Sequence, residues 1–383
     1  MKKGWQIKTI GDVCEVIAGQ SPEGKFYNAE GKGMPFYQGK KDFGDKFIEA
    51  PTTWTTQTTK IAKAGDILMS VRAPVGPVNF ATDEVCIGRG LAAIRSSDEL
   101  NRDFLFYQLW HLQPEIAGRE GAVFASINKA EIEALPLAYA PLAEQQRIVG
   151  LLDEAFEGLA TAKANAEKNL QNARALFESH LQSVFTQRGP GWVEKRFDEV
   201  CAITSTLVDP RKKEFLDLTH VGAGNIESKT GVFVDLKTAR EEGLISGKFL
   251  FDESMVLYSK IRPYLMKVAR PDFEGLCSAD MYPLAPIPNV VTRDYLFHLL
   301  LSKHFTDYAI QGSARAGMPK VNREHLFEFK VWLPDVKKQE QLAANLDDLH
   351  EETQRLACLY ERKHAALEAL KKSLLHQAFI GEL

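Results

Sequence analysis

The sequence predicts an α+β protein that is built twice: two α/β domains separated by two long antiparallel α-helices, which form a coiled-coil spacer with a pseudo-two-fold internal repeat. Three observations predict it. A long amphipathic stretch runs from Pro141 to about Thr186, a copy of it follows 194 residues later, and shorter motifs elsewhere also occur twice. With 383 residues, the chain is too long for one ordinary hydrophobic core.

The first long helix is predicted by apolar residues at alternating steps of four and three, which is the spacing of a heptad seam. These positions are Ile148, Leu152, Ala155, Leu159, Ala162, Ala166, Ala173, Leu176 and Val184. Asn169 and His180 are polar interruptions, which can fix the register of packed helices or lie just off the seam. Pro141 precedes the helix, and the run Gly189-Pro190-Gly191 ends it.

The second long helix repeats the pattern, so that adding 194 to Ile148 gives Leu342. A helix of ~42 residues spans ~60 Å, and its apolar stripe needs a partner of the same period. The simplest partner is its own repeat, and an antiparallel pair would relate the two halves by an approximate two-fold axis. The residues expected in this packing are Ile148, Leu152, Leu159 and Leu176 in the first helix, and Leu342, Leu346, Leu356, Leu367 and Leu370 in the second.

The repeat extends beyond the helices. Cys14 matches Cys201 at an offset of 187 residues, and Cys86 matches Cys277 at 191. The run Ile67–Pro74 resembles Val256–Pro263, Arg102–Leu109 resembles Arg293–Leu300, and Gly121–Lys129 resembles Gly312–Lys320. Residues 66–72 and 254–260 read as buried strands, and 103–112 and 294–305 as short amphipathic helices. We expect α/β domains in 1–140 and 189–333, and the long helices in 141–188 and 334–383.

Composition narrows the functional classes. Hydrophobic residues make up 45% and charged residues 26%, as in a soluble globular protein, and no run approaches the ~18 apolar residues of a membrane span. The five cysteines are far apart, which indicates neither a zinc site nor a disulfide framework and fits the cytoplasm. The net charge is −4, and no segment is basic, so a DNA-binding surface would have to be a local patch.

Several motifs, in an order that occurs twice, resemble the specificity subunit of type I restriction–modification systems. They are Gly65–Gly76, Gly88–Arg95, Ser126–Lys129 leading to Pro141–Ile148, and, in the second half, Val221–Ile226, Gly312–Lys320 and Pro334 with Gln339. The resemblance covers essentially the whole chain and implies two target-recognition domains, each followed by a conserved helix. One departure is at the helix start, where the family's Glu-Gln pair is Glu144-Gln145 in the first copy but Lys338-Gln339 in the second.

The resemblance implies a non-catalytic subunit that reads a bipartite asymmetric target in double-stranded DNA. Its helices would set the unread spacer and dock modification subunits, which methylate adenine N6, and restriction/translocase subunits would join for cleavage. No cofactor is expected in this chain; S-adenosylmethionine, ATP and Mg²⁺ are expected on the partner subunits. The sequence contains no phosphate loop and no Asn/Asp-Pro-Pro-Tyr/Phe methyltransferase motif. The alternatives are an adaptor with two ligand-binding domains on a helical spacer and an independent enzyme.

The candidate DNA contacts in the first half are polar residues beside glycines and strand ends. Lys40 and Lys41 form a basic loop suited to phosphate, or a solvated turn. Gln38 could pair with an adenine edge, and Arg89, between two glycines, could read guanine. Arg72 recurs as Arg262 near a strand end, where either could reach DNA or form a structural ion pair.

The candidates in the second half surround a repeated polar loop. Lys129 recurs as Lys320, and with Arg315 and Arg323 the latter forms the best basic cluster of this half. Lys260, at the end of the buried strand, completes the set. The histidines lack the spacing of metal ligands, so no metal site is expected.

Overall fold

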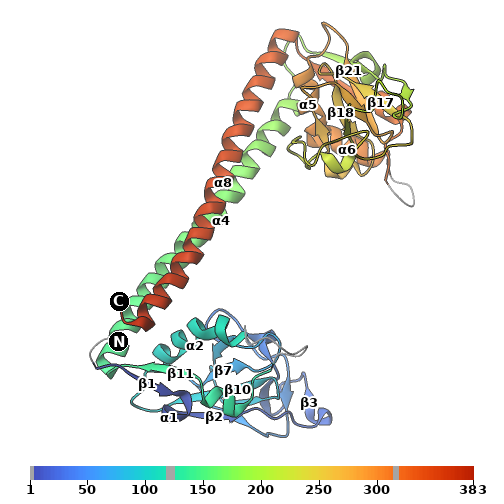
Figure 1. The fold of residues 1–383 in the computed structure, drawn as a ribbon. Helices are drawn as coiled ribbons and strands as arrows, with labels where there is room; N and C mark the ends of the chain where they lie inside the picture. The colour runs from blue at the N-terminus through green and yellow to red at the C-terminus, as the bar shows by residue number, and fades with distance from the viewer. Residues whose placement is uncertain (1–3, 118–125, 314–318) are drawn as a thin grey trace. The chain divides into compact units, whose positions relative to one another are not determined.

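The computed structural model describes residues 4–117, 126–313 and 319–383 (Figure 1). The chain divides into two compact units, residues 1–166 with 362–383 (unit 1) and residues 167–361 (unit 2). Each unit consists of a mixed α/β head and a part of each long helix. We call the heads head 1 (residues 4–141) and head 2 (residues 187–335).

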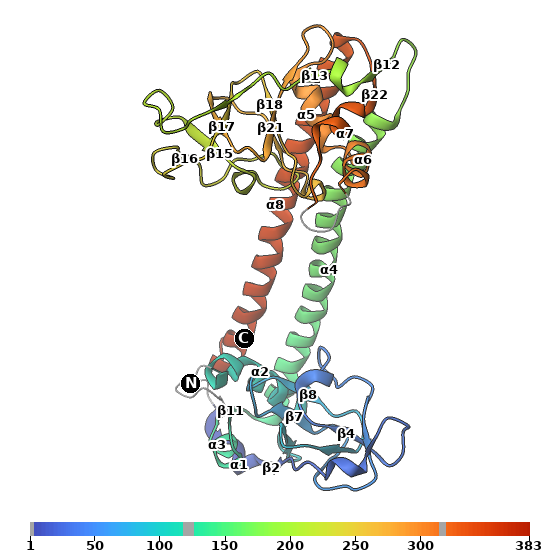
Figure 2. The ribbon, with the colours of Figure 1, turned by 90° about the vertical axis from the view of Figure 1, so that its right-hand side faces the viewer.

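The two long helices are α4 (Leu142–Thr186) and α8 (Val336–Ile380), with 45 residues each. In unit 1, Lys163 Nζ of α4 lies 2.8 Å from Glu368 Oε1 of α8, and in unit 2 Arg174 Nη2 lies 2.8 Å from Glu361 Oε1. The partner number falls as the α4 number rises, so the helices are antiparallel in both units (Figure 2). The sequence predicted this antiparallel arrangement.

The seam between the helices differs from the predicted one in its second part. Ile148, Leu152 and Leu346 are buried, and the partly buried positions are Leu159, Leu342, Leu356 and Leu367. Leu176 and Leu370, however, are 52% and 47% exposed, so their predicted packing role is wrong. In α4 the buried side follows Ala166, Ala173, Phe177 and Leu181 instead, and Asn169 and His180 are exposed.

The physical reason is helical drift. A helix with 3.6 residues per turn rotates away from a strict seven-residue repeat, so an extra step of four is needed at intervals. The buried positions place this step between Ala166 and the half-buried Leu170, which turns Phe177 inward and Leu176 outward.

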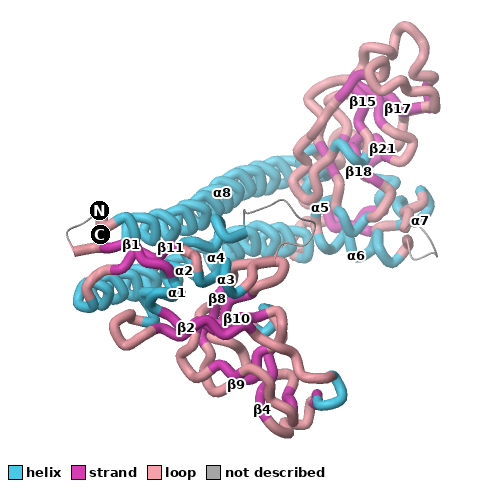
Figure 3. The backbone as a smooth tube through the Cα atoms, turned by 60° about the horizontal axis from the view of Figure 1, so that its bottom comes forward, coloured by secondary structure: helices cyan, strands magenta, loops and turns pink. Residues whose placement is uncertain are grey.

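The described residues of head 1 form three sheets, in the strand orders β1-β11, β2-β10-β7-β8 and β3-β5-β4-β9-β6. Figure 3 shows β1 beside β11 and β2 beside β10. Its strands are β1 (Gln6–Thr9), β2 (Cys14–Ala18), β3 (Tyr27–Asn28), β4 (Met34–Tyr37), β5 (Trp54–Thr55), β6 (Ile61–Ala62), β7 (Ile67–Ser70), β8 (Val78–Phe80), β9 (Val85–Ile87), β10 (Leu91–Ser96) and β11 (Pro136–Tyr139). Its helices are α1 (Ile10–Val13), α2 (Arg102–Ala117) and α3 (Lys129–Glu133). The predicted strand in residues 66–72 is β7, and the predicted helix in 103–112 lies within α2.

Head 2 has sheets β12-β22, β13-β21-β18-β19 and β14-β17-β20-β15-β16, which repeat this topology except at one edge strand, since β14 pairs with β17 whereas β3 pairs with β5. Its strands are β12 (Val193–Arg196), β13 (Cys201–Ala202), β14 (Leu207–Val208), β15 (Thr219–Val221), β16 (Lys237–Thr238), β17 (Lys248–Phe251), β18 (Val256–Ser259), β19 (Val268–Ala269), β20 (Gly275–Cys277), β21 (Met281–Pro286) and β22 (Lys330–Leu333). Its helices are α5 (Arg293–Leu301), α6 (Lys303–Gln311) and α7 (Arg323–Glu328). The predicted helix in 294–305 is two helices, because the Ser302 side chain accepts a hydrogen bond from Phe305 N and starts α6.

Strand pairing corrects one of the repeat assignments and confirms another. Tyr37 pairs with Ile87 in parallel β4 and β9, and Val221 pairs with Cys277 in parallel β15 and β20. Cys277 is therefore equivalent to Ile87 rather than to Cys86. Cys14 and Cys201 do correspond, since each begins a strand that pairs in the same register with the end of β10 or β21.

A buried glutamine joins each long helix to its head. Gln145 Nε2 donates to Ala140 O (2.7 Å), and Gln145 Oε1 accepts from Asn101 N (2.7 Å). Gln339 makes the same contacts with Pro334 O (2.9 Å) and Thr292 N (3.0 Å). Both glutamines are fully buried. The departure at the preceding position, Glu144 in one copy and Lys338 in the other, therefore leaves the glutamine contacts unchanged.

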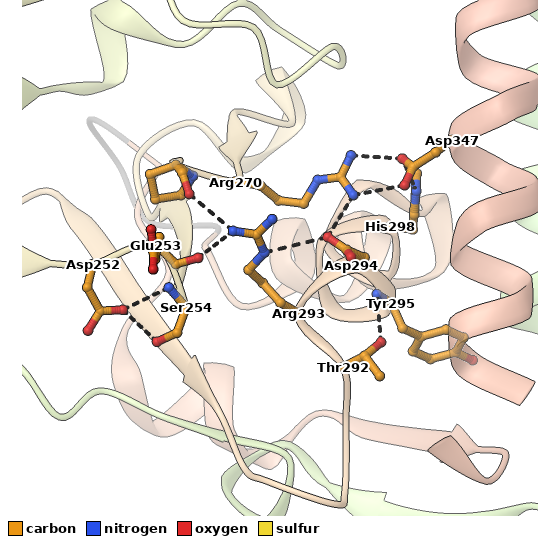
Figure 4. Close-up of polar contacts among 11 residues, drawn as sticks. Asp252, Glu253, Ser254, Arg270, Thr292, Arg293, Asp294, Tyr295, His298 and Asp347 are labelled. Atoms are coloured by element: carbon orange, nitrogen blue, oxygen red, sulfur yellow. Dashed lines mark hydrogen bonds and ion pairs between the residues drawn. The ribbon is translucent and has the colours of Figure 1, made fainter. Parts of the chain in front are cut away.

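A second polar contact joins each long helix to a short helix of its head. In unit 2 the Asp347 carboxylate of α8 accepts hydrogen bonds from Arg270 (2.8 and 3.0 Å) and contacts His298 Nε2 at 2.9 Å (Figure 4). Arg270 also donates to Asp294 at 2.9 Å. These contacts hold the pKa of Asp347 well below its usual range, whereas burial lowers the pKa of His298. His298 is therefore neutral and donates to the carboxylate.

Unit 1 contains the equivalent contact with different residues. Asp153 of α4 accepts a short hydrogen bond from the Tyr107 hydroxyl, and Lys46 Nζ lies 3.4 Å from Asp153 and 3.0 Å from Asp103. Tyr107 corresponds to His298, and Lys46 takes the role of Arg270. We call the two clusters the helix anchors: Lys46, Asp103, Tyr107 and Asp153 in unit 1, and Arg270, Asp294, His298 and Asp347 in unit 2.

Candidate nucleic-acid interface

Head 1 has a hollow of about 210 Å³ at the carboxyl ends of three strands. β4 ends at Tyr37, β7 at Ser70 and β9 at Ile87, and the residues that follow each strand contribute to its lining. The lining residues are Gln38, Gly39, Lys40, Ser70, Arg72, Ala73, Arg89 and Gly90. We call this the head 1 hollow, and it brings together four of the candidate DNA contacts.

Strand pairing explains why these residues meet. Because β4 and β9 are parallel, their carboxyl ends lie at the same edge of the sheet. Gly88 N donates to Tyr37 O (2.8 Å) and Gly90 N to Gln38 O (3.1 Å), which continues the pairing past the strand ends. Val71 N then donates to Gly90 O (3.0 Å), so the end of β7 joins the other two.

The glycines of this edge allow the backbones to touch. A Cβ atom at Gly90 would lie 2.3 Å from Gln38 O, so no other residue fits without a shift of the backbone. A Cβ atom at Gly88 would lie 3.0 Å from the Phe36 ring and the Ser21 hydroxyl. The loop that carries Arg89 is thus pressed against the loop that carries Gln38.

The cations of the hollow face solvent. Lys40, Arg72 and Arg89 are exposed and form no ion pair within the described part of the chain. A hydrogen bond from Ser70 Oγ to Arg72 O (3.1 Å) holds the backbone at the end of β7. Positive groups without an acidic partner beside an exposed amide side chain are suited to phosphate oxygens and base edges.

The other two candidates of head 1 lie outside the lining of this hollow. Lys41 Nζ is 3.9 Å from Asp42 and 3.4 Å from the Thr52 hydroxyl. Lys129 opens α3, where its Nζ lies 3.5 Å from Glu133. Both side chains are exposed, and each has an acidic neighbour that reduces its local positive charge.

Head 2 carries a cluster of cations around one carboxylate. Lys260 and Lys320 each lie 3.8 Å from Asp280 Oδ1, and Lys260 Nζ is 5.2 Å from the Tyr282 ring. The Arg323 guanidinium lies 5.9 Å from the same ring. Burial, followed by the charge of Lys320, lowers the pKa of Lys260.

Of the remaining candidates of head 2, Arg262 is described by the structure and Arg315 is not. Arg262 is exposed and has a left-handed backbone with φ of 50°. Its N–H donates to Pro319 O (2.9 Å), which ties it to the segment that carries Lys320. Arg315 lies outside the residues that the structure describes.

Backbone contacts correct two of the predicted equivalences. Ser70 and Ser259 each bond the carbonyl two residues later, so Arg72 corresponds to Ile261 and not to Arg262. Asn128 and Asn322 both cap a short helix, so Lys129 corresponds to Arg323 and not to Lys320. The physical reason is that short loops in the two heads differ in length. A sequence offset taken from one motif is therefore wrong by a few residues in the next.

The sequence reasoning missed residues that support the interface. The Ser21 hydroxyl accepts the Arg89 N–H (3.2 Å), and Asp280 lies between the two lysines of head 2. Ser70 could have been found, because the repeated motif preserves it as Ser259. Ser21 and Asp280 have no such signal, since their importance arises from contacts between distant segments.

The described residues contain neither a metal-ligand cluster nor a membrane-spanning helix. Over residues 4–117, 126–313 and 319–383, no three His, Cys, Asp or Glu side chains are grouped as metal ligands. Within the same described residues, no helix combines the length and apolar character that crossing a bilayer requires.

Comparison with known sequences identifies the family. The model of the type I restriction modification DNA specificity domain matches this chain twice, over residues 2–170 and 190–359. The chain is 27% identical to the specificity subunit of the type I restriction enzyme EcoDI from Escherichia coli, over 99% of this chain and 88% of that protein. It is 39% identical to the putative MjaX specificity subunit from Methanocaldococcus jannaschii, but that match covers 44% of this chain and only 40% of the relative.

Solved structures show the same fold. A chain from a study of complex assembly and conformational transition in the type I restriction–modification system superimposes with a TM-score of 0.79, at 17% identity, covering 100% of this chain and 99% of the other. The HsdS subunit from Thermoanaerobacter tengcongensis gives 0.66 at 18% identity, covering 100% and 98%. The twofold family match and the duplicated heads and helices lead to one assignment: the chain belongs to the type I restriction–modification DNA specificity family, and its role is DNA recognition as a specificity subunit.

Proposed function

We propose that this chain reads a bipartite, asymmetric sequence in double-stranded DNA, with head 1 reading one half and head 2 the other. The observation that carries the proposal is the head 1 hollow, where Lys40, Arg72 and Arg89 converge without an ion-pair partner in the described chain. The cation cluster of head 2 lies at the corresponding strand ends. Phosphate contacts would supply affinity, and contacts to base edges would supply sequence preference.

The long helices support the second part of the proposal. Each is continuous over 45 residues and contributes to both compact units. We propose that they set the length of the unread spacer and dock the modification subunits. Restriction/translocase subunits would join this assembly, which would act in the cytoplasm.

The proposal assigns no reaction step to this chain. S-adenosylmethionine, ATP and Mg²⁺ would bind the partner subunits, and the methylated adenine would leave the base stack for a partner's pocket. Here the recognition heads would hold the DNA on either side of the flipped base.

Methylation and DNA binding test the proposal together. The assembled complex of this chain with its modification subunits is expected to methylate adenines in one bipartite sequence, mapped across a genome with and without the gene. Neither this chain alone nor the modification subunits alone should do so. Methylation by the isolated chain would contradict its non-catalytic role.

Charge variants test the surface. Lys40→Ala is expected to weaken binding of the complex to all duplexes alike and to reduce the slope of log K against log salt by about one. Lys63→Ala removes an exposed cation that precedes β7, at the opposite end of the strand from the hollow, and serves as the control. Unchanged affinity of Lys40→Ala at two salt concentrations would remove the hollow from the interface. A complex that binds no DNA would favour an adaptor with two protein ligands.

A further inference from the structure

The two heads differ where their folds correspond most closely. Strand pairing makes Val221 of β15 equivalent to Tyr37 of β4, and Cys277 of β20 equivalent to Ile87 of β9. Ser278 N donates to Val221 O (2.9 Å) as Gly88 N donates to Tyr37 O (2.8 Å). The backbones at these strand ends can therefore be compared residue by residue.

Among the described residues, the base-reading candidates of the head 1 hollow have no polar equivalents at the matching positions of head 2, although Ser70 recurs as Ser259. Gln38 corresponds to Gly222, and Lys40, which begins a 3-10 turn, corresponds to Ala223, which begins the equivalent turn. After β9 and β20, Arg89 corresponds to Ala279, and Gly90 corresponds to Asp280. Gly90 has no Cβ atom, which leaves room for Gln38 O. The cations of head 2 come instead from Lys260 and Lys320, at positions that are Val71 and Ser126 in head 1.

Arg89 stands out in head 1 because its backbone is fixed while its side chain is free. The Arg89 N–H donates to the Ser21 hydroxyl (3.2 Å), and the flanking glycine N–H groups donate to Tyr37 and Gln38. Leu91 N closes the loop by donating to Gly88 O (3.0 Å). The guanidinium is exposed and has no hydrogen-bond or ion-pair partner among the described residues.

A fixed backbone with a free guanidinium is suited to reading a base. The guanidinium presents a planar fork of donors that matches O6 and N7 of guanine in the major groove. Because the loop that carries Arg89 is already ordered, it can hold the guanidinium in the orientation that these hydrogen bonds require. The exposed amide of Gln38, which lines the same hollow, has the donor and acceptor pair that matches the N6 and N7 edge of adenine.

We propose that Arg89 reads a guanine in the half of the target bound by head 1, and that head 2 has no counterpart of this contact. The inference rests on the proposed function, since it assigns a base to a surface that must first bind DNA. The half bound by head 1 thus contains a G·C pair whose replacement is detected by Arg89, with Gln38 facing the neighbouring base pair. The half bound by head 2 is read by other groups.

The test uses the full chain assembled with its modification subunits and short duplexes of the target mapped by methylation. Each base pair of both halves is replaced in turn, and affinities are measured for the wild type and for Arg89→Lys. The lysine keeps the charge but loses the planar fork. We expect the wild type to lose affinity by roughly 5- to 140-fold when one G·C pair of one half is replaced, and Arg89→Lys to be nearly indifferent at that position.

Three controls separate this result from a general loss of binding. Arg89→Lys should keep the salt slope of the wild type, because the number of positive charges is unchanged. Arg102→Lys, an exposed arginine of head 1 outside the lining of the hollow, should keep the wild-type preference at every position. A duplex with 7-deazaguanine at the identified base should weaken wild-type binding and leave Arg89→Lys binding unchanged, without any change in protein stability.

The outcomes distinguish the inference from the proposed function. Binding that remains specific in Arg89→Lys, with unchanged discrimination at every base pair, overturns the guanine contact but leaves DNA recognition intact. A target half whose only affected position is an A·T pair also overturns it. A wild-type complex that binds no duplex contradicts the proposed function itself.

Discussion

At the scale of the residue, the buried glutamines show how one side chain can fix the entrance to a long helix. Gln145 and Gln339 are amides that both donate and accept, and each satisfies backbone groups of the segment before the helix and of the loop before α2 or α5. A buried amide N–H or carbonyl left without a partner costs about 1 to 3 kcal/mol. The residue before each glutamine is partly or fully exposed and differs between the copies.

Replacing one glutamine should therefore destabilise its own unit. Gln145→Ala leaves Asn101 N and Ala140 O without their partner, so we expect a loss of about 1 to 3 kcal/mol in the free energy of unfolding, measured by urea denaturation. Gln146→Ala, at the exposed neighbouring position, should change it by less than about 0.5 kcal/mol. Equal effects of the two substitutions would show that the glutamine contacts do not stabilise the helix entrance.

Among the elements, each long helix packs both against the other long helix and against a head. In unit 2, Phe177, Leu181 and Val184 of α4 share a core with Leu346 of α8 and with head 2. In unit 1, Ile148 and Leu152 of α4 share a core with Leu375 and Ala378 of α8 and with head 1. The buried face is therefore chosen by both partners.

Adjacent residues of α4 test the position of this face. Phe177→Ala should lower the free energy of unfolding by about 3 to 5 kcal/mol, because it removes a buried ring and leaves a cavity. Leu176→Ala should change it by less than about 0.5 kcal/mol, because that side chain is exposed. The seam predicted from the sequence requires the reverse order, so urea denaturation of this pair decides between the two.

Because of its helix anchor, the free energy of unfolding of unit 2 should depend on pH. His298 has a lowered pKa and is neutral in the folded unit, whereas in the unfolded chain it takes up a proton near pH 6.5. Stability therefore falls as the pH drops below about 6.5. Asp347 has a lowered pKa too, so its contribution is present above pH ~3.8 and is lost only at more acidic pH.

The equivalent residue of the other anchor provides the matched variant. His298→Tyr introduces the residue found at the equivalent position Tyr107 and keeps a hydrogen-bond donor toward Asp347. Because the unfolded variant no longer takes up the proton of His298, its free energy of unfolding should fall less between pH 7 and pH 5. His350 and His304 also have pKa values lowered by burial and should account for part of the remainder. An unchanged slope, measured by urea denaturation at each pH, would exclude His298 as a source of this dependence.

In the whole molecule, two unlike heads, which share their strand order except for the placement of β3 and β14, are joined to two continuous helices. Both α4 and α8 contribute residues to both units, so their length can change without a change in the sequence of either head. The proposed function makes this length the determinant of the unread spacer.

Inserting one heptad in α4 after Ala166 and one in α8 after Glu361 preserves the seam and adds about 10.5 Å to each helix. At about 3.4 Å per base pair, we expect the unread spacer to lengthen by about three base pairs while both half-sequences stay the same. Mapping methylated adenines in cells that carry the variant measures this. A lengthened helix pair with an unchanged spacer would show that other parts of the complex set the distance.

The repeated architecture and the family could be predicted from the amino-acid sequence. The 3.6-residue period, the breaks at Pro141 and Gly189, and the recurrence of motifs are local signals, so the long helices, β7 and β18 could be located without coordinates. The residues of the head 1 hollow could also be named one at a time, because glycines and strand ends are visible in the chain. Their meeting could not be foreseen.

Which residues face each other follows from contacts between distant segments. The phase that buries Phe177 instead of Leu176 depends on a head and a second helix packing against the same face. The convergence of Gln38, Arg72 and Arg89 depends on the parallel pairing of β4 with β9 and on the contact from β7. The physical reason is that a periodic pattern is set by neighbours along the chain, whereas register and convergence are set by contacts between segments about 20 to 170 residues apart.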